Sequence, residues 1–576
     1  MTRVCSTEVD GVPVRWAADG TPGRAVLVFR TGLVDEAFPQ TGWTHAVEHL
    51  ALHPLGVQPH AYDGSVDLLT TRFGTAGTPE QVTGFFRQVC GNLQRLPAQR
   101  WDDERRVLEV EAQQHGRGPG GLLLLHRFGA LGHGALGGLE WGRHAATPDD
   151  LTRWARTRFT RQNAVLCLSG PPPAGLVLPL PEGEPRPVPP LRPLVDGRGV
   201  VVDGRLPGST LSLLLDAPED QAEALGQLVV GRVVRALRFD AALSYSPQVW
   251  STALSGSATA LTLHADTRPG DEAAATARML EVVEELARDG AGPDERAADG
   301  RHRDAAAADD GPDAAWGDVR RAALRTLLPD GHAPVPHREA APLLADGLRT
   351  ALLGVPAHEA APAGWPVLPH GSPHLPEGVP LYREEDPALP RRLVVTGSGI
   401  GLHLGPDAYA TVPWAECAGV AEWDDGSHFV LGTDGVGVHV DPAHWPDGER
   451  LVGVLTAQRP PHLVAQQGPA EVDEAEREWR AERAASRDRV GTARVELDRS
   501  RRRMLAALAR ALPVLALVLL VLGGAVALLA RYAGAVAGVV APLLLGALLY
   551  AGWRSSRSSP APDPPASGSP TPAPTP

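Results

Sequence analysis

A short histidine motif constrains this chain more than any other stretch. His45, Glu48 and His49 form the pattern His-x-x-Glu-His. On an α-helix, residues four apart project from one face, so the two imidazoles can share a metal ion. Glu48 lies on the same side, where its carboxylate can serve as a base toward a water at that metal. The motif predicts a helix with a zinc site; the alternative is two surface histidines and a solvated glutamate on an amphipathic helix.

A second stretch offers the carboxylate ligand that a catalytic zinc site takes beside its histidines. Residues 101–111 are predicted to be helical, and they carry Glu104 and Glu111 seven residues apart. Seven residues is close to two turns, so both carboxylates share one face of this helix. Glu111 is therefore the candidate third zinc ligand. Glu104 is a candidate for a group that orients the site from behind the ligands.

Together the two motifs resemble the insulinase/pitrilysin family of zinc metallopeptidases, the inverzincins. The resemblance implies His45, His49 and Glu111 as zinc ligands, Glu48 as general base and Glu104 as the supporting carboxylate. One region departs from the family. Its members carry an Asn-Ala pair on the strand after the metal helix, where a strand edge binds the substrate backbone. The corresponding region here reads Tyr62-Asp63-Gly64-Ser65-Val66-Asp67.

The first 355 residues are predicted to be of the α+β class, as two similar insulinase-like domains. In the first, a strand at 25–29 precedes the metal helix, and Thr78 and Thr147 begin helices with capping boxes. A Pro-rich linker separates this domain from the second. The full organisation predicted in chain order is a zinc-site peptidase domain at 1–180, a second peptidase-like domain at 195–355, a linker at 356–380, a small β domain at 381–460, a charged helical stalk at 470–503, transmembrane helices at 511–530 and 534–553, and a disordered tail at 558–576.

Arg238 and Tyr245 in the second domain resemble an Arg and a Tyr that the family places opposite the zinc. By that resemblance Tyr245 stabilises the oxyanion and Arg238 holds substrate. From the residues alone, a helix-end arginine and an interfacial tyrosine fit equally well. Single-chain family members have four such domains, and half-length members close their chamber by pairing. The resemblance therefore implies a homodimer or a homologous partner chain, with Tyr245 acting across the interface.

The sequence after residue 380 changes to short strands separated by Gly, Asp and Pro turns, followed by an apolar helix at 449–455. This pattern resembles a small pleckstrin-homology-like β domain. Residues 471–503 are densely charged with both signs, and several opposite charges lie four residues apart. Such pairs favour an exposed helical stalk.

Two uncharged apolar runs, 511–530 and 534–553, are each long enough to cross a bilayer. Three residues separate them, which predicts a transmembrane hairpin; a buried hairpin in a soluble core is the alternative. Arginines gather on both flanks, whereas only Arg531 lies between the runs. The positive-inside rule therefore predicts that both flanks, and the N-terminal domains with them, are cytoplasmic. The first residues also lack the apolar stretch of a secretory signal.

Composition narrows the class of function. The net charge of −14 argues against a nucleic-acid-binding protein, and the use of arginine for all 54 basic residues indicates a high-GC bacterial genome. The four scattered cysteines fit buried thiols in a reduced compartment. The sequence thus predicts a membrane-tethered zinc endopeptidase that hydrolyses peptides or unfolded polypeptide segments at the cytoplasmic face. The alternative is a non-catalytic, peptidase-like scaffold that binds peptide at the membrane, as the missing Asn-Ala pair would allow.

Overall fold

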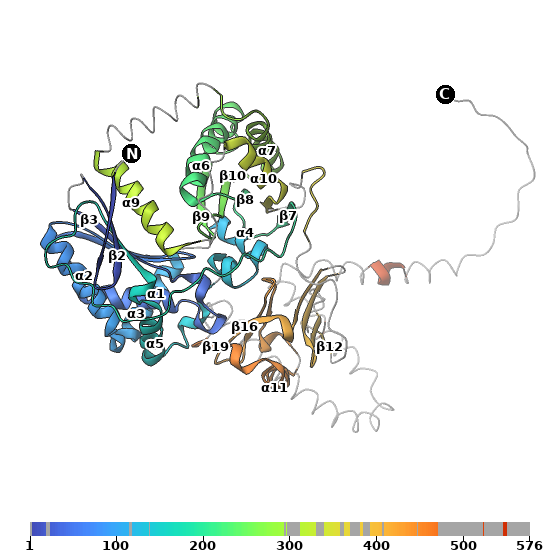
Figure 1. Ribbon diagram of the computed structural model, residues 1–576. Coiled ribbons are helices and arrows are strands. Elements are labelled where there is room, and N and C mark those ends of the chain that lie inside the picture. The colour runs from blue at the N-terminus through green and yellow to red at the C-terminus, as the bar shows by residue number, and fades with distance from the viewer. Residues whose placement is uncertain are drawn as a thin grey trace, which may run out of the picture. The chain divides into compact units, whose positions relative to one another are not determined.

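The computed structural model describes residues 3–18, 23–114, 118–137, 139–292, 295, 311–329, 339–356, 362–368, 381–383, 392–405, 408–445, 447–469, 522 and 545–549. Residues Met1–Glu471 form one compact unit and Val472–Pro576 a second. Within the described residues of the first unit the chain forms four β-sheets with helices packed against them (Figure 1). The mixed α+β class predicted from the sequence is therefore confirmed.

The first domain is built on a six-stranded sheet. One face of this sheet carries the helices that hold the histidine motif, and phenylalanines from strand and loop meet beneath them, as in the edge-to-face contact of Phe29 with Phe159 at 5.1 Å. The capping boxes predicted at Thr78 and Thr147 are both present. The strands, in sheet order, are β1 (Val4–Val9), β2 (Val12–Ala17), β6 (Ala164–Leu168), β3 (Arg24–Phe29), β5 (Thr71–Ala76) and β4 (Ala61–Val66), and the helices are α1 (Trp43–Leu52), α2 (Pro79–Gln94), α3 (Trp101–Gln114) and α5 (Pro148–Arg158).

The second domain has a five-stranded sheet with helices on one face. A π-helical turn, η8 (Arg235–Asp240), continues its first helix. The strands, in sheet order, are β7 (Gly199–Val202), β11 (Leu352–Val355), β8 (Gly208–Leu215), β10 (Thr259–Asp266) and β9 (Gln248–Ala253), and the helices packed on them are α6 (Glu219–Val234), α7 (Glu272–Asp289) and α10 (Ala340–Arg349).

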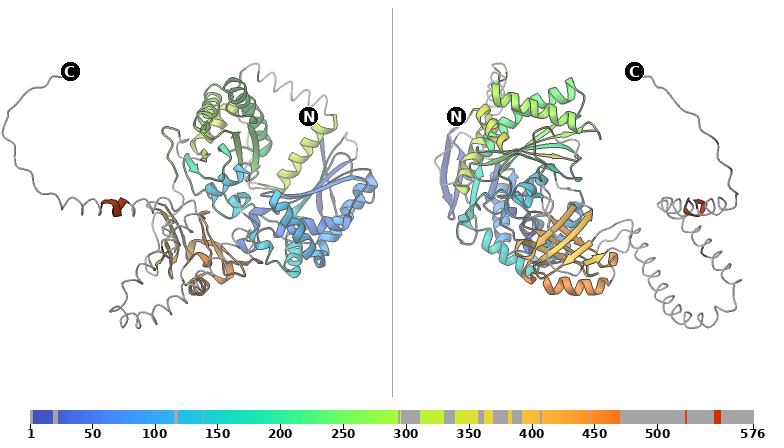
Figure 2. Two further views of the ribbon diagram at one scale, coloured as in Figure 1. Left: turned by 180° about the vertical axis from the view of Figure 1, so that it is seen from behind. Right: turned by 90° about the vertical axis from the view of Figure 1, so that its right-hand side faces the viewer.

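The two domains exchange one helix each. Helix α9 (Gly311–Leu327) packs across β2 and β6 of the first sheet, with Val319 and Ala323 fully buried (Figures 1 and 2). Helix α4 (Pro119–Phe128) packs on β8, β10 and β11 of the second sheet. There the buried guanidinium of Arg127 donates to the carbonyls of Ser212, at 2.9 Å, and Thr350, at 2.6 Å. Each sheet is thus covered on both faces, which explains why strands such as β3 are apolar on both sides.

The β domain (residues 381–469) has two four-stranded sheets around a shared aliphatic core that includes Val412, Val430 and Leu451. Its assignment as pleckstrin-homology-like stays a prediction. The first sheet has the order β12 (Leu381–Arg383), β13 (Arg392–Val395), β14 (Gly399–Gly405) and β15 (Ala408–Pro413); the second has β18 (Gly437–Val440), β17 (His428–Gly432), β16 (Cys417–Glu422) and β19 (Val464–Gln466), with helix α11 (Gly448–Gln458) closing the core.

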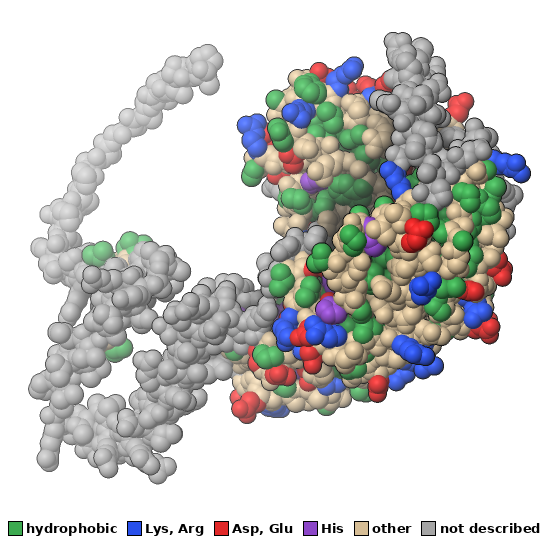
Figure 3. Space-filling view, turned by 90° about the vertical axis from the view of Figure 1, so that its left-hand side faces the viewer, with side chains coloured by type: hydrophobic (Ala, Val, Ile, Leu, Met, Phe, Trp, Pro, Cys, Tyr) green, Lys and Arg blue, Asp and Glu red, His purple; other side chains and the backbone are tan. Residues whose placement is uncertain are grey.

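The predicted stalk, hairpin and tail lie outside the described residues, apart from Leu522 and residues 545–549. Across the part of the chain that is described, no helix has both the length and the apolar character needed to span a bilayer. The two transmembrane helices stay predictions. On the face drawn in Figure 3, acidic and arginine side chains are interspersed rather than gathered by sign.

Candidate metal centre

The metal helix α1 is fixed at its start by a carboxylate from the segment just before it. Glu36 is 5% exposed and accepts hydrogen bonds from the backbone N–H of Gly42, at 2.9 Å, and of Thr44, at 2.8 Å. These bonds satisfy two of the donors that a helix leaves unpaired at its N-terminus. Burial nevertheless raises the pKa of Glu36 to about 7. On the inner face of α1, Val47 and Leu50 are buried in the core, which leaves the histidines on the opposite side.

The structure brings His45, His49 and Glu111 together. The Nε2 atoms of His45 and His49 lie 3.7 and 3.2 Å from Glu111 Oε2, and one candidate ligand atom from each residue lies within 4.8 Å of the others. Four-coordinate zinc, with bonds of about 2.0–2.1 Å, separates its donor atoms by about 3.3 Å. The spacing and the donor types therefore fit a zinc ion.

Carboxylates behind the histidines fix which ring nitrogen faces the cluster. His45 Nδ1 lies 2.9 Å from Glu140 Oε1, and His49 Nδ1 lies 3.5 Å from Glu104 Oε2. Each imidazole thus has Nδ1 engaged and Nε2 turned toward Glu111, as in metal sites where a carboxylate orients a ligating histidine. Glu104 also contacts His53 Nδ1 at 2.6 Å, one helical turn further on.

The charges of the cluster favour a bound cation. Burial alone lowers the pKa of His45, but the hydrogen bond and charge of Glu140 outweigh it and raise the pKa to about 9. The pKa of His49 is lowered, by burial and by the neighbouring His45. Four carboxylates, including those of Glu111 and Glu104, surround these two imidazoles. Because ligands must be deprotonated, binding of a metal would release the proton from His45.

Glu48 lies between this cluster and the edge of the first sheet. Its Oε2 is 3.7 Å from His49 Nε2, the residue is 5% exposed, and burial raises its pKa to about 7. On its other side it touches Gly64 of β4 so closely that a Cβ on Gly64 would lie 1.7 Å from Glu48 Oε1. Strand β4 is the last in its sheet order and pairs only with β5 in the described part of the chain. The Glu48 carboxylate therefore lies over one face of this edge strand, against its backbone at Gly64.

Arg238 and Tyr245 form a pair of their own. Arg238 lies in η8, and its guanidinium is 4.7 Å from the ring centre of Tyr245, which is 74% exposed. The loop is anchored by Asp266, which accepts from the backbone N–H of Ser246 at 2.9 Å. None of the contacts that the structure describes for this pair involves the histidine cluster. Their roles in the reaction stay predictions.

Four residues around the centre are not indicated by the sequence reasoning. Glu140 and Glu36 contact α1 from segments outside the motif, and neither is at a helical spacing from its histidines. Gly64 acts only through the space that it leaves for Glu48. No spacing rule connects such residues to the motif. His53 is different, because it follows His49 by four residues and extends the His45–His49 row by one turn. That repeat is a signal which could have identified it.

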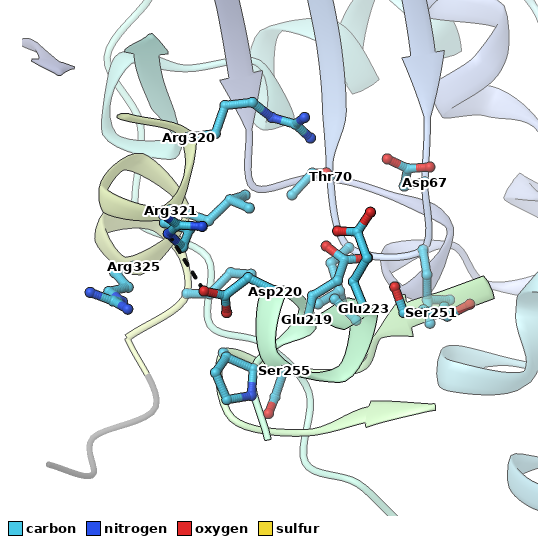
Figure 4. Close-up of a pocket in the computed structure, with 18 of the residues that line it drawn as sticks. Asp67, Thr70, Glu219, Asp220, Glu223, Ser251, Ser255, Arg320, Arg321 and Arg325 are labelled. Carbon is cyan, nitrogen blue, oxygen red and sulfur yellow. Dashed lines mark ion pairs between the residues drawn. The ribbon is translucent and has the colours of Figure 1, made fainter. Parts of the chain in front are cut away.

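A larger cavity, of about 370 Å³, lies away from the metal cluster (Figure 4). It is bounded by the loop at 67–70, by the start of β5 and of α6 and by α9, and neither the histidines nor Glu111 line it. Its walls carry both signs of charge, and Arg321 pairs with Asp220 at 3.6 Å. The potential metal ligands and the potential base do not line this cavity, so its volume does not make it the candidate reaction site.

No family model matches the sequence, and no curated protein is similar to it. Similar solved structures include a protease from Helicobacter pylori, with 13% identity over 62% of this chain and 100% of that one, at a TM-score of 0.49. The inactive domain of an M16 peptidase from Pseudomonas fluorescens has 13% identity over 61% of this chain and 97% of that one, at a TM-score of 0.48. Pitrilysin has 12% identity over 62% of this chain and 45% of that one, at a TM-score of 0.43. These similar structures are M16 or insulinase-family peptidases and peptidase-like domains. Since the identities are low and the TM-scores are below 0.5, the function proposed for this chain rests on its own metal centre.

Proposed function

We propose that this chain is a zinc-dependent endopeptidase that hydrolyses peptides or unfolded polypeptide segments. The observation that carries the proposal is the position of Glu48. This buried carboxylate lies between the ligand set of His45, His49 and Glu111 and one face of the edge strand β4 at Gly64. A carboxylate beside both a metal site and a strand that could bind an extended peptide suits metal-assisted amide hydrolysis.

The residues have distinct roles in this proposal. His45, His49 and Glu111 hold the zinc, while Glu140 and Glu104 keep the two imidazoles oriented. A bound zinc would supply Lewis acidity and an acidified water. Glu48 takes a proton from the attacking water and passes it to the leaving amine. Its raised pKa, near 7, suits a group that must accept and donate at neutral pH.

The edge of β4 favours an extended backbone as substrate. An added strand binds through main-chain hydrogen bonds, which folded proteins rarely expose, and this selects peptides and unfolded segments. Side chains of such a strand alternate between the two faces of the sheet. One face is that of Glu48, and the other carries a cavity of about 190 Å³ lined by residues that include Asp63, Ser65, Trp316 and Arg320.

The substitution Glu48→Gln tests the catalytic role. We expect it to keep zinc, because Glu48 is not a ligand, and to lower peptide cleavage by about 10²–10⁴-fold, the usual contribution of a general base. Zinc content and turnover of a peptide library measure the two effects. Glu284→Gln, on the exposed side of α7, is the matched control and should leave both unchanged. Cleavage by Glu48→Gln at the unsubstituted rate, or by the chelator-treated unsubstituted protein, would refute the proposal.

The second candidate function is a non-catalytic scaffold that binds peptide. The observation that favours it is the sequence of β4, where Asp63-Gly64-Ser65 stands in place of the Asn-Ala pair expected from the family resemblance. Zinc bound through His45 and His49, together with measurable peptide affinity but no cleavage of any library member, would favour the scaffold over the enzyme.

We further propose that the chain works as a homodimer or with a homologous chain, at the cytoplasmic face of a membrane. The support for pairing is the exposed Phe239 and Tyr245, which flank Arg238 and offer aromatic surface to a partner. The support for the membrane is the pair of apolar runs in the sequence. A monomeric mass by light scattering would contradict the homodimer, and recovery of the full chain in the soluble fraction would contradict the anchor.

A further inference from the structure

The β domain packs against two short segments that adjoin the metal helix α1 in space. One is η2 (Phe38–Gln40), just before α1, and the other is η6 (Trp141–Arg143), just after Glu140. Strand β16 contacts η2, and strand β19 contacts both segments. The β domain therefore meets the first domain at the parts of the chain that hold the metal centre.

The segment 140–143 is fastened to the metal centre by a set of hydrogen bonds. Glu140 contacts His45 Nδ1 at 2.9 Å, and Arg143 donates to the other oxygen of Glu140, also at 2.9 Å. Arg143 also donates to the carbonyl of Leu108 on α3, the helix that carries Glu104 and Glu111. The indole of Trp43, the first residue of α1, donates to the Gly142 carbonyl at 3.1 Å. A displacement of this segment would therefore move the orienting carboxylate of His45.

The β domain holds the same segment from the other side. The ring of Trp141 stacks on Phe429 at 5.5 Å and meets Trp423 edge-to-face, also at 5.5 Å. The buried amide of Gln467 donates to the Trp141 carbonyl at 2.9 Å. Trp141 is thus clamped through both its side chain and its backbone, one residue from Glu140.

A second contact fixes the chain in front of α1. Phe38 is 1% exposed and lies in a socket formed by small residues, where a Cβ on Gly419 would be 1.9 Å from its ring and where Ala421 and Ala465 complete the wall. The carbonyl of Phe38 accepts from the Thr41 hydroxyl at 2.9 Å, and that hydroxyl accepts from the Gly142 N–H at 2.9 Å. The socket therefore holds η2, and the Thr41 hydroxyl joins η2 to η6.

We propose that the β domain supports the metal centre, and that Trp423, Phe429 and Gln467 are positioning residues which keep Glu140 on His45 through Trp141. This inference rests on the proposed zinc site but not on peptide hydrolysis. Weakening the contact of these three residues with Trp141 should leave all proposed ligands in place and weaken metal binding. Outer partners of metal ligands typically contribute about 10–100-fold to affinity, and residues acting through such a partner should contribute toward the lower end, about tenfold.

The experiment compares two tryptophans of the β domain in the full chain. Trp423→Ala removes the contact with Trp141, whereas Trp445→Ala removes an equally large side chain from the β-domain core, where it clusters with Leu451 and Leu455. Zinc dissociation constants come from competition with a chromophoric chelator, and thermal melts report folding. We expect Trp423→Ala to weaken zinc binding about tenfold. Trp445→Ala should lower the melting temperature and leave the zinc dissociation constant unchanged.

Two milder variants keep the test decisive if Trp423→Ala does not fold. Trp423→Phe retains an aromatic contact and should restore most of the affinity. Gln467→Leu removes the bond to the Trp141 carbonyl, together with a bond to the Ala465 carbonyl inside the β domain, and should weaken zinc binding severalfold. Folded variants at Trp423 and Gln467 that bind zinc as the unsubstituted chain does would overturn the inference. Failure of the proposed function looks different, because the unsubstituted chain would then bind no zinc through His45 or would bind it without cleaving peptide.

Discussion

The substitution Gly64→Ala tests the contact between the proposed base, Glu48, and strand β4 without replacing a proposed ligand or Glu48 itself. A Cβ at residue 64 would lie 1.7 Å from Glu48 Oε1 and 2.7 Å from Leu52 Cδ1, whereas real Cβ contacts are rarely closer than 3.0 Å. The carboxylate must therefore move by about 1.3 Å. A misplacement of about 1 Å in a reacting group costs on the order of 10²-fold in rate, or about 2.7 kcal/mol of barrier.

The cost to stability should be smaller than the cost to catalysis. The end of a glutamate side chain can rotate away, and the methyl of Leu52 needs only a small shift, so overpacking should cost about 1–3 kcal/mol. The assay is a steady-state comparison of kcat and KM on one peptide, with zinc content and a thermal melt on each sample. We expect kcat to fall about 10²-fold while the bound zinc stays stoichiometric.

Gly74→Ala is the matched control. Gly74 pairs directly with Asp63 in the β4–β5 register, and its added Cβ would press on Asp63 Oδ1 at 2.5 Å rather than on Glu48. The same methyl is thus added to the same sheet against a different carboxylate. If Gly64→Ala lowers kcat no more than Gly74→Ala does, the proposed position of Glu48 at the reacting atoms is wrong.

Two further substitutions test the surroundings of the site. Glu140→Gln should weaken zinc binding by about 10–100-fold, because it removes the charge that holds His45 Nδ1, and chelator competition measures it; an unchanged dissociation constant would contradict the role. Asp203 accepts a hydrogen bond from His126 of the exchanged helix α4 at 3.1 Å. Burial raises the pKa of Asp203, but the hydrogen bonds from His126 and Arg205 outweigh burial and lower that pKa well below its usual range. A carboxylate whose pKa is lowered by folding stabilises the folded state above its unfolded pKa of about 3.9, and this stabilisation is lost as the pH falls. Asp203→Asn should therefore lower the melting temperature at pH 7, and the difference from the unsubstituted chain should narrow below about pH 4.

Helical spacing within the two motif segments was sufficient to predict which side chains of the candidate site lie close together. The motif of His45, Glu48 and His49 requires only that residues 45–49 be helical, and α1 spans Trp43–Leu52. Glu111 follows from the same kind of argument, since a carboxylate two turns after Glu104 must lie on the same face of α3. Capping boxes at Thr78 and Thr147 are also local, because the bonds involved join residues three apart.

The β domain illustrates where local patterns are insufficient. The sequence predicted five of its strands, at 393–396, 399–404, 411–414, 428–431 and 435–440, which correspond to β13, β14, β15, β17 and β18. It did not indicate β12 (Leu381–Arg383), β16 (Cys417–Glu422) or β19 (Val464–Gln466). Strand β16 is rich in small residues such as Gly419 and Ala421, which have low strand propensity. Their purpose is to admit Phe38, a residue some 380 positions earlier, so the reason for the composition lies outside the segment.

The amino-acid sequence by itself determined which residues could act as ligands and base, because their chemistry and their spacing on a helix are local properties. Only the tertiary structure decided what surrounds them: Glu140 behind His45, Gly64 against Glu48, and the exchange of α4 and α9 between the sheets. The physical reason is that a hydrogen bond or a van der Waals contact between distant segments leaves no periodic trace in either one. Such contacts are fixed by packing, which exists only once the chain has folded.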